Sequence, residues 1–188
     1  ELAFGKDFET YYGWGTWIYW LPESFKHSSQ TMTQIGEGKL CSVFPIYERS
    51  AVWFVAPVPQ GAGKNPETRV SLLREQFKNF KGRVPEILEL APKDEPVFYD
   101  DLAHVEMPVS YNGRIVLIGD AQHAASPVSG MGASMALEDA FVLAQELKNN
   151  SDLDEALKGY VLRRKERIKL YHQITERWDR WILARGAM

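Results

Sequence analysis

Cysteine, a basic charge excess and long apolar runs are all scarce in this chain of 188 residues. The single cysteine, Cys41, excludes a disulfide framework and a zinc site built from several thiolates, and it fits a reducing, cytoplasmic compartment best. The formal net charge of −3 lacks the basic footprint of a nucleic-acid binder. No apolar run approaches the roughly 20 residues that cross a bilayer, and the first residues do not have the pattern of a signal peptide. We therefore expect no nucleic-acid partner, no membrane span and no metal.

The N-terminal part is rich in β-sheet signals. Residues 12–59 hold short β-branched and aromatic runs separated by glycine-rich or charged turns, which is typical of an antiparallel meander. The turn at residues 36–39 predicts a hairpin. Tyr12, Trp14, Trp17 and Trp20 either line an aromatic substrate pocket or belong to the sheet core. We favour the core, although strand alternation sends these side chains to both faces.

Helical spacing begins after a loop at residues 60–65. Pro66 suits the first turn of a helix, and Gly82 ends the pattern whose apolar positions are Val70, Leu73, Phe77 and Phe80. Residues 84–90 predict a second short helix, and residues 97–108 an extended segment. Residues 114–118 are apolar after the first residue, as expected for a strand buried on both faces.

Two long helices are predicted at the C-terminal end. The first begins near Gly132 and places five residues on one apolar side: Leu137, Ala140, Phe141, Ala144 and Leu147. It breaks at residues 149–152, where Ser151 or Asp152 can cap the next helix. That helix keeps an apolar period to Ile182. Its basic residues are interleaved with acids and favour a solvated face over a phosphate or membrane patch: Arg163, Arg164, Lys165, Arg167 and Lys169.

Residues 119–134, called here the motif segment, carry the chemistry. Asp120 follows the predicted strand at its carboxyl end, where open α/β folds bind ligands, and its carboxylate can accept hydrogen bonds from sugar or polyol hydroxyls. Gly130 and Gly132 let the backbone approach a flat ligand. The free amides and positive dipole end of the following helix suit an electron-rich oxygen. Pro127 stiffens the loop between these groups.

The same segment resembles the second flavin fingerprint of class A FAD monooxygenases, the aromatic hydroxylases of the para-hydroxybenzoate hydroxylase type. The resemblance runs from residue 113 to residue 140 and rests on these positions: Gly119, Asp120, Ala121, His123, Pro127, Gly130, Gly132, Leu137, Glu138, Asp139 and Ala140. Two positions depart from it, since Gln122 replaces an alanine and Ser134 an asparagine that is frequent there.

The resemblance implies roles. Asp120 would bind the ribityl hydroxyls of FAD, Pro127 would pack beside the isoalloxazine ring, and the amides of Gly132, Ala133 and Ser134 would face the pyrimidine edge. Met131 either contacts the ring or fills the loop. The cofactor-binding set that we predict is Gly119, Asp120, Pro127, Gly130, Met131, Gly132, Ala133 and Ser134.

No side chain is assigned a catalytic role, because the resemblance implies that the cofactor carries the chemistry. His123 could be a base, but we favour a structural residue that bonds the nearby backbone. Glu138 and Asp139 could be a pair of acid and base carboxylates. Adjacent helix positions point apart, however, and we favour a structural role for both.

The family's N-terminal βαβ unit with Gly-x-Gly-x-x-Gly is not found in this sequence. Residues 61–64 lack the final glycine and an acidic partner, and we interpret them as a loop. We expect the C-terminal part of a para-hydroxybenzoate hydroxylase-like α+β or α/β fold. Residues 1–110 would form the substrate-domain sheet with one or two helices, and residues 111–188 the end of the FAD-binding domain with the long helix. An ADP-binding unit would be supplied in cis or in trans.

The resemblance implies an FAD-dependent monooxygenase that uses NAD(P)H and O2 on an aromatic or polycyclic small molecule. The isolated chain is expected to hold FAD weakly and to be inactive. Two alternatives stay open: a flavin-dependent reductase of prenyl chains, and a non-catalytic half of a split flavoprotein that needs a partner.

Overall fold

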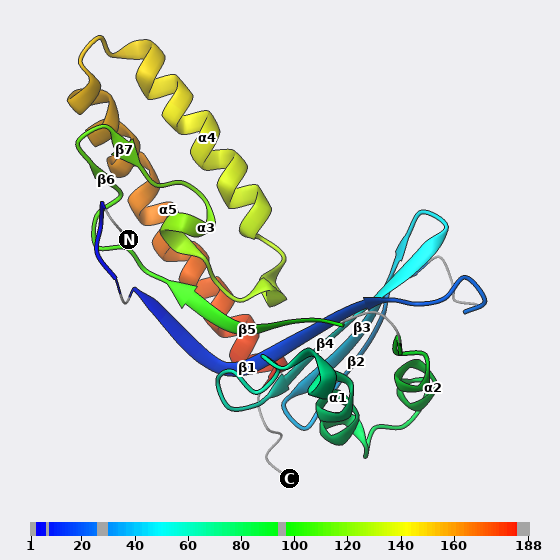
Figure 1. Cartoon of the computed structure of the whole chain (residues 1–188). Helices are drawn as coiled ribbons and strands as arrows, with labels where there is room; N and C mark the ends of the chain where they lie inside the picture. Colours follow the sequence, from blue (N-terminus) through cyan, green and yellow to red (C-terminus); the bar gives the residue numbers. More distant parts are fainter. Residues whose placement is uncertain (1–2, 7, 26–29, 94–96, 184–188) are drawn as a thin grey trace. The chain divides into compact units, whose positions relative to one another are not determined.

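A computed structural model of the chain describes residues 3–6, 8–25, 30–93 and 97–183 (Figure 1). The chain divides into two compact units. The sheet unit contains residues 11–102 and 182–188, and the helical unit contains residues 1–10 and 103–181. Within the described residues, no helix combines the length and the apolar character needed to cross a membrane.

A five-stranded sheet with the order β2-β3-β4-β1-β5 runs through the described part of the chain. Its strands are β1 (Glu9–Trp20), β2 (Met32–Gly36), β3 (Lys39–Ile46), β4 (Arg49–Pro57) and β5 (Phe98–Val105). The pairs β2–β3, β3–β4 and β4–β1 are antiparallel. The predicted meander is confirmed for β2, β3 and β4, whereas β1 pairs with β4 and not with β2, the next strand in the sequence. Gly36 pairs with Lys39, and the turn residues Glu37 and Gly38 have φ of 53° and 71°, as a two-residue type I′ hairpin requires.

Helices cover one face of this sheet (Figure 1). They are the short η1 (Pro66–Thr68), α1 (Arg69–Phe77) and α2 (Val84–Glu89), which confirm the two predicted helices. The Phe54 and Phe77 rings meet edge to face at 4.8 Å between centroids. Trp17 is fully buried and donates from its indole to the Arg69 carbonyl at 3.2 Å. Each such large apolar side chain contributes about 1.5–3 kcal/mol of burial free energy.

Strand alternation separates the β1 aromatics into two groups. Trp17 and Tyr19 lie in the core under the helices, whereas Trp20 on the other face is 47 % exposed. Ile18 shares that open face and is 39 % exposed. The core interpretation therefore holds for Trp17 and not for Trp20.

The loop at residues 61–64 is explained by packing. The Gly61 amide donates to Asp101 Oδ2 at 2.7 Å, so a carboxylate already occupies the loop. A Cβ on Gly63 would lie 2.4 Å from the Tyr99 ring, and only glycine fits there. These contacts suit a loop that closes over β5 and not one that cradles a phosphate.

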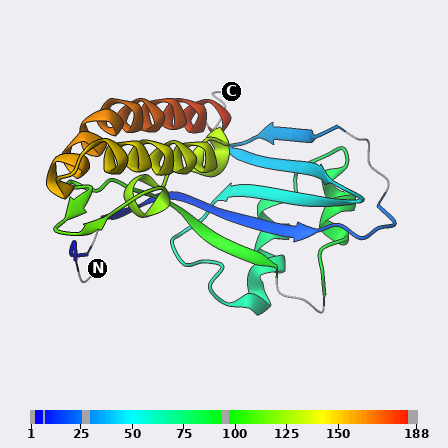
Figure 2. The same cartoon turned by 90° about the horizontal axis from the view of Figure 1, so that it is seen from above.

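The helical unit contains the motif segment and two long helices. Its elements are β6 (Tyr111–Asn112), β7 (Ile115–Val116), α3 (Asp120–His123), η2 (Pro127–Ser129), α4 (Gly132–Asn149) and α5 (Leu153–Ile182), with Ile182 itself assigned to the sheet unit. Asp152 caps α5, since its Oδ1 accepts from the Glu155 amide at 3.0 Å. Helices α4 and α5 lie side by side in both ribbon views (Figure 2), as the ion pair between Arg164 and Asp139 requires.

One burial expectation for this unit was wrong. The strand at residues 114–118 reduces to β7, which in the described part of the chain pairs with β6 alone, and Ile115 is 53 % exposed. On α4 the predicted apolar side is open, with Leu137 73 % and Phe141 63 % exposed. A doubly buried strand needs neighbouring strands and a covering layer on each face. Within the described residues, no such layer covers these side chains.

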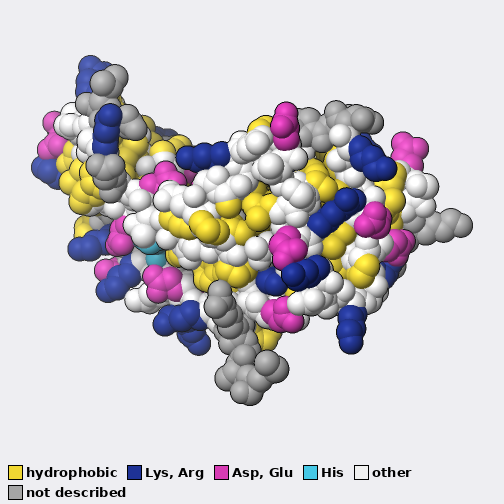
Figure 3. Space-filling model, turned by 60° about the horizontal axis from the view of Figure 1, so that its bottom comes forward, with side chains coloured by type: hydrophobic (Ala, Val, Ile, Leu, Met, Phe, Trp, Pro, Cys, Tyr) yellow, Lys and Arg dark blue, Asp and Glu magenta, His cyan; other side chains and the backbone are white. Residues whose placement is uncertain are grey.

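Charges of both signs are interspersed on the surface. On the face drawn in Figure 3, lysine and arginine side chains alternate with aspartate and glutamate, with apolar side chains between them. This mixture matches the small net charge of the chain.

Candidate functional site

The motif segment opens with a turn that only glycine allows. Gly119 has φ +58° and ψ −142°, and a Cβ there would lie 3.0 Å from that of Ala136. The chain then enters α3, whose first residue is Asp120. The Asp120 side chain is exposed, and its Oδ1 lies 3.9 Å from the position that a Cβ on Gly132 would take. The turn therefore brings the Asp120 carboxylate to the start of α4.

The loop after α3 ends where the sequence predicts. Ser126 caps η2, Pro127 is its first residue, and Gly130 ends it in the left-handed region with φ +66°. Helix α4 then begins at Gly132. The first amides of α4 have no acceptor within the helix, as at the start of any α-helix.

A hollow of about 420 Å³ lies at this point of the helical unit. It is lined by Asp120, Ala125, Pro127, Gly130, Gly132, Ala133, Ala136 and Tyr171. Five predicted cofactor-binding residues are thus brought together: Asp120, Pro127, Gly130, Gly132 and Ala133. The other three do not line it. Gly119 is buried in the turn, Met131 is half-buried before α4, and Ser134 is exposed in the first turn of α4.

Sequence reasoning did not assign Tyr171 to the site. This side chain comes from α5 and is 1 % exposed, and burial together with the nearby Asp120 charge raises its pKa. In the sequence Tyr171 is one of several apolar positions with helical period, and nothing local connects it to a loop some forty residues earlier.

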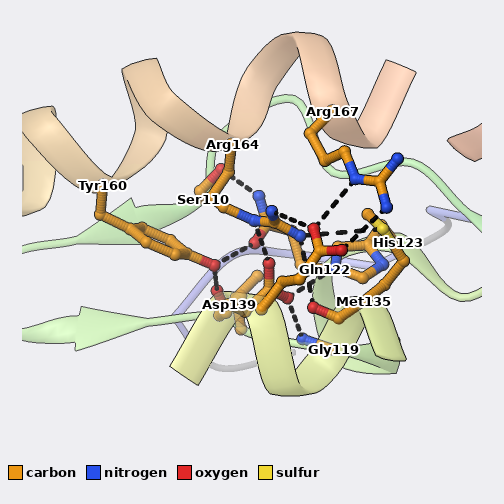
Figure 4. A network of polar contacts seen from close by, with 11 residues as sticks. Ser110, Gly119, Gln122, His123, Met135, Asp139, Tyr160, Arg164 and Arg167 are labelled. Atoms are coloured by element: carbon orange, nitrogen blue, oxygen red, sulfur yellow. Dashed lines mark hydrogen bonds and ion pairs between the residues drawn. The ribbon is translucent and has the colours of Figure 1, made fainter. Parts of the chain in front are cut away.

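A buried polar network lies behind the turn (Figure 4). The Asp139 carboxylate on α4 is 0 % exposed. Its Oδ2 accepts from the Gly119 amide at 2.8 Å and from His123 Nε2 at 2.6 Å, and its Oδ1 accepts from Arg164 Nε at 2.6 Å. Burial acts to raise the pKa of Asp139. The hydrogen bonds from His123, Gly119 and Arg164 outweigh it, and the pKa is lowered.

His123 and Asp139 bond each other, so the partner of His123 differs from the prediction. The imidazole bonds a side-chain carboxylate on α4 and not the nearby backbone. Glu138 is a neighbour of this network, since it accepts from Arg164 Nη1 and Arg167 Nη2, each at 2.8 Å. Hydrogen bonds from Arg167 and Arg164 lower the pKa of Glu138 to about 2.

The solvated-face prediction was wrong for Arg164. This residue is 3 % exposed and points between α4 and α5, whereas Arg163, Lys165 and Lys169 on the same helix are exposed. The interleaved acids that favoured a solvated face do not distinguish one arginine from the next. Arg164 is buried because a buried carboxylate, Asp139, faces it.

Gln122, a departure from the family pattern, has a packing role. It is 6 % exposed and accepts from Tyr160 Oη at 2.9 Å. Its side-chain amide donates to the Ser110 hydroxyl. The larger side chain therefore links α3 to α5 and stays outside the residues that line the hollow.

Helix α5 also holds the loop before Gly130. Ser126 Oγ donates to Asp179 Oδ1 at 2.8 Å, and Thr175 Oγ1 donates to Ser129 Oγ at 3.0 Å. Asp179 is 3 % exposed, and burial raises its pKa to about 6. The loop that carries Pro127 is thus held in place by hydrogen bonds to two side chains of α5, Thr175 and Asp179.

Comparison with known proteins gives a family match over most of the chain. A model described as an FAD binding domain matches residues 16–175. The chain is 35 % identical over 133 residues to the aurachin C monooxygenase/isomerase of Stigmatella aurantiaca. The aligned region covers 70 % of this chain and 34 % of that protein. It is 29 % identical over 167 residues to the FAD-dependent urate hydroxylase of Klebsiella oxytoca. This second aligned region covers 85 % of this chain and 42 % of that protein.

A solved structure gives the same result. Klebsiella pneumoniae HpxO complexed with FAD and uric acid superimposes with a TM-score of 0.82 and 25 % identity, covering 95 % of this chain and 46 % of that one. The chain spans between about a third and a half of the length of the curated relatives that it matches. The fold thus matches para-hydroxybenzoate hydroxylase-like monooxygenases over about half of their length.

Proposed function

Since this chain belongs to the FAD-binding class A flavin monooxygenase family, we propose that it forms the part of an FAD-dependent monooxygenase that holds the ribityl chain and pyrimidine edge of the cofactor. The observation that carries the proposal is the hollow of about 420 Å³ in which the Asp120 carboxylate, Pro127 and the start of α4 meet. A hydroxyl acceptor and a set of free amides on two sides of one hollow suit a polyol joined to an electron-rich ring.

Each predicted cofactor-binding residue has a proposed role. The Asp120 carboxylate accepts hydrogen bonds from ribityl hydroxyls, and Pro127 packs beside the ring system. The amides of Gly132, Ala133 and Ser134 donate to the pyrimidine edge, where the dipole of α4 favours negative charge. Gly130 adds no side chain to the hollow that it lines, and the position that its Cβ would take has no atom within 4 Å. Gly119 sets the turn, and Met131 flanks the start of α4.

FAD, reduced by NAD(P)H, supplies the oxygen chemistry of such an enzyme when it is bound. The residues of this chain bind the cofactor and orient it. No side chain of the motif segment is needed as an acid or a base, and the hydrogen bond from His123 to Asp139 fits this view.

The proposed substrate is an aromatic or polycyclic small molecule. Support comes from the open face of the sheet unit, where Trp20 is 47 % exposed and Trp53 is half-buried. The Trp53 indole donates to Thr16 Oγ1 at 2.7 Å, which fixes one aromatic ring on this face. Flat aromatic surfaces of this kind favour flat ligands.

A partner unit that binds the ADP half of FAD is part of the proposal, in the same polypeptide or in another. Its support is the exposed apolar surface of the helical unit, formed by Ile115, Ile118, Leu137 and Phe141, which are 39–73 % exposed. Leu137 and Phe141 are four residues apart on α4 and so lie on one side of that helix, and exposed apolar side chains that lie together mark interaction sites.

The test is expression of the natural protein that contains this chain, next to the 188-residue chain alone. The natural protein should purify with a visible flavin absorption band and consume O2 with NAD(P)H when a suitable aromatic compound is present. Reduction of a prenyl chain without O2 uptake would identify a reductase instead. A natural protein that consists of these 188 residues and binds a separate dinucleotide-binding protein would identify a split module.

A further inference from the structure

We propose that Asp139 is a positioning residue for the flavin-binding turn, which it holds through the Gly119 amide and the His123 imidazole. The proposal rests on the proposed function, because the group that it positions is the Asp120 carboxylate. Asp139 itself does not line the hollow.

The geometry of α3 carries the inference (Figure 4). This helix is only four residues long, from Asp120 to His123. Gly119, which precedes it, and His123, which ends it, both donate to the same atom, Asp139 Oδ2, at 2.8 and 2.6 Å. One buried oxygen thus holds both ends of the turn on which Asp120 lies.

Packing against α4 also leaves the turn little room for movement. A Cβ on Gly119 would lie 3.0 Å from that of Ala136, which is three residues before Asp139 on α4. The turn is therefore packed against α4 at Ala136 and hydrogen-bonded to it at Asp139. The direction in which Asp120 leaves the backbone is fixed relative to the first turn of α4, which carries the proposed pyrimidine contacts.

Asp139 is held in turn by Arg164. The guanidinium donates from Nε to Asp139 Oδ1 at 2.6 Å, from Nη1 to Glu138 Oε2 at 2.8 Å and from Nη2 to the Met135 carbonyl at 3.3 Å. All three contacts lie on α4, so the arginine fork orients the carboxylate from the side opposite to α3.

Stability alone is a weak reason for this arrangement. Asp139 and Arg164 are 0 % and 3 % exposed, and removal of both charges from water costs free energy that their attraction repays only in part. Apolar residues of similar volume often stabilise a protein equally well. A buried ion pair differs from them in the directionality of its hydrogen bonds, and here one of these bonds fixes the amide next to Asp120.

The test compares Asp139→Asn with Glu138→Gln in the natural protein that contains this chain. Asparagine has the same shape, but it turns an N–H toward either the Gly119 and His123 donors or the Arg164 donor. Glu138→Gln weakens the ion pairs that residue 138 makes with Arg164 and Arg167. It does not change the hydrogen bonds at either end of α3. The measurements are the FAD dissociation constant, the melting temperature, and the amide proton shift of Gly119 in protein labelled with 15N-glycine.

We expect Asp139→Asn to weaken FAD binding about tenfold or more and to move the Gly119 amide resonance upfield, because a charged acceptor is lost. Glu138→Gln should lower the melting temperature to a similar or smaller degree and leave the FAD dissociation constant within about twofold of the wild-type value. A folded Asp139→Asn protein with a shifted Gly119 resonance and unchanged FAD affinity would overturn the inference and leave the proposed function intact.

His123→Leu serves if Asp139→Asn does not fold, since leucine has no hydrogen-bond donor and so releases one end of α3 while the buried ion pair is kept. It should also weaken FAD binding, and unchanged affinity in this variant would overturn the inference as well. A wild-type protein that binds no FAD would overturn the proposed function. In that case the Gly119 resonance of the variants still shows whether Asp139 holds the turn.

Discussion

The hydroxyl of Ser126 donates a 2.8 Å hydrogen bond to Oδ1 of Asp179, a carboxyl that is only 3 % exposed. The second oxygen of Asp179 is buried and has no hydrogen-bond partner in the described residues. Burial therefore raises the pKa of Asp179 to about 6, with a smaller contribution from the nearby Glu176 charge. The loop that carries Pro127 rests on a group that titrates close to neutral pH.

Asp179→Asn should stabilise the protein above pH 6 and have little effect near pH 4. Between about pH 4 and pH 6 the folded state holds a proton that the unfolded state has released, so stability falls as pH rises through this window. Asparagine still accepts from Ser126 and carries no charge, which removes a penalty of up to about 2 kcal/mol. Urea unfolding of both proteins across this pH range measures the difference. An advantage of equal size at every pH would show that Asp179 is not the titrating group.

Asp120→Ala should reduce flavin affinity without loss of stability. The Asp120 side chain is exposed beside the hollow, so its removal leaves no buried group unpaired. We expect FAD binding in the natural protein to weaken by about tenfold, as for the loss of one or two hydrogen bonds to a carboxylate. Fluorescence titration with FAD measures this change, and Glu166→Ala, which removes an exposed carboxylate from α5, is the matched control. Equal affinity in the two variants would remove Asp120 from the site.

Gly63→Ala should destabilise the sheet unit by about 1–3 kcal/mol. The new Cβ would lie 2.4 Å from the Tyr99 ring, which packs on Trp17 at 5.0 Å between centroids and cannot shift without disturbing the core. The control is Gly36→Ala, because its Cβ would meet only Phe80, at 3.9 Å. Thermal unfolding of both variants checks the prediction, and similar melting temperatures would contradict it.

Phe141→Ser should lower the stability of the natural protein far more than the exposure of the Phe141 side chain in this chain suggests. The side chain is 63 % exposed on α4 and belongs to the surface that we propose faces an ADP-binding unit. If that unit covers it, the loss of a buried phenyl group costs about 3 kcal/mol and lowers FAD retention. Leu162→Ser on α5, at a side chain that is 77 % exposed, is the comparison variant and should be near neutral. A neutral Phe141→Ser would indicate that another surface meets the partner.

Local signals predicted most of the elements. The hairpin at Gly36 to Lys39, the start of α4 at Gly132 and the cap of α5 at Asp152 each depend on residues close together in sequence, and the structure has all three. Cap and turn chemistry acts over a few residues, so a sequence window contains the whole cause.

Contacts made by α5 could not be predicted in this way. Tyr171 lines the hollow, Arg164 binds Asp139, and Asp179 holds Ser126. Arg164 and Asp139 are 25 residues apart along the chain, and Asp179 and Ser126 are 53 residues apart. Their helical period shows that they are on a helix, but the period does not identify what they face. Burial of the strand at residues 114–118 was wrongly predicted for a related reason. An apolar pattern indicates that a surface needs a cover and does not identify the part of the protein that supplies it.

The contacts of α5 have a consequence for protein engineering. The motif segment is short and looks transferable, yet its loop rests on Ser126 and Ser129 contacts to α5 and its turn on Asp139, which Arg164 of α5 orients. A designer who grafts only residues 119–134 into another scaffold would transplant a sequence without its support. The smallest portable unit is the motif segment together with α4 and the part of α5 from Tyr160 to Asp179, and swaps between relatives should exchange that whole block.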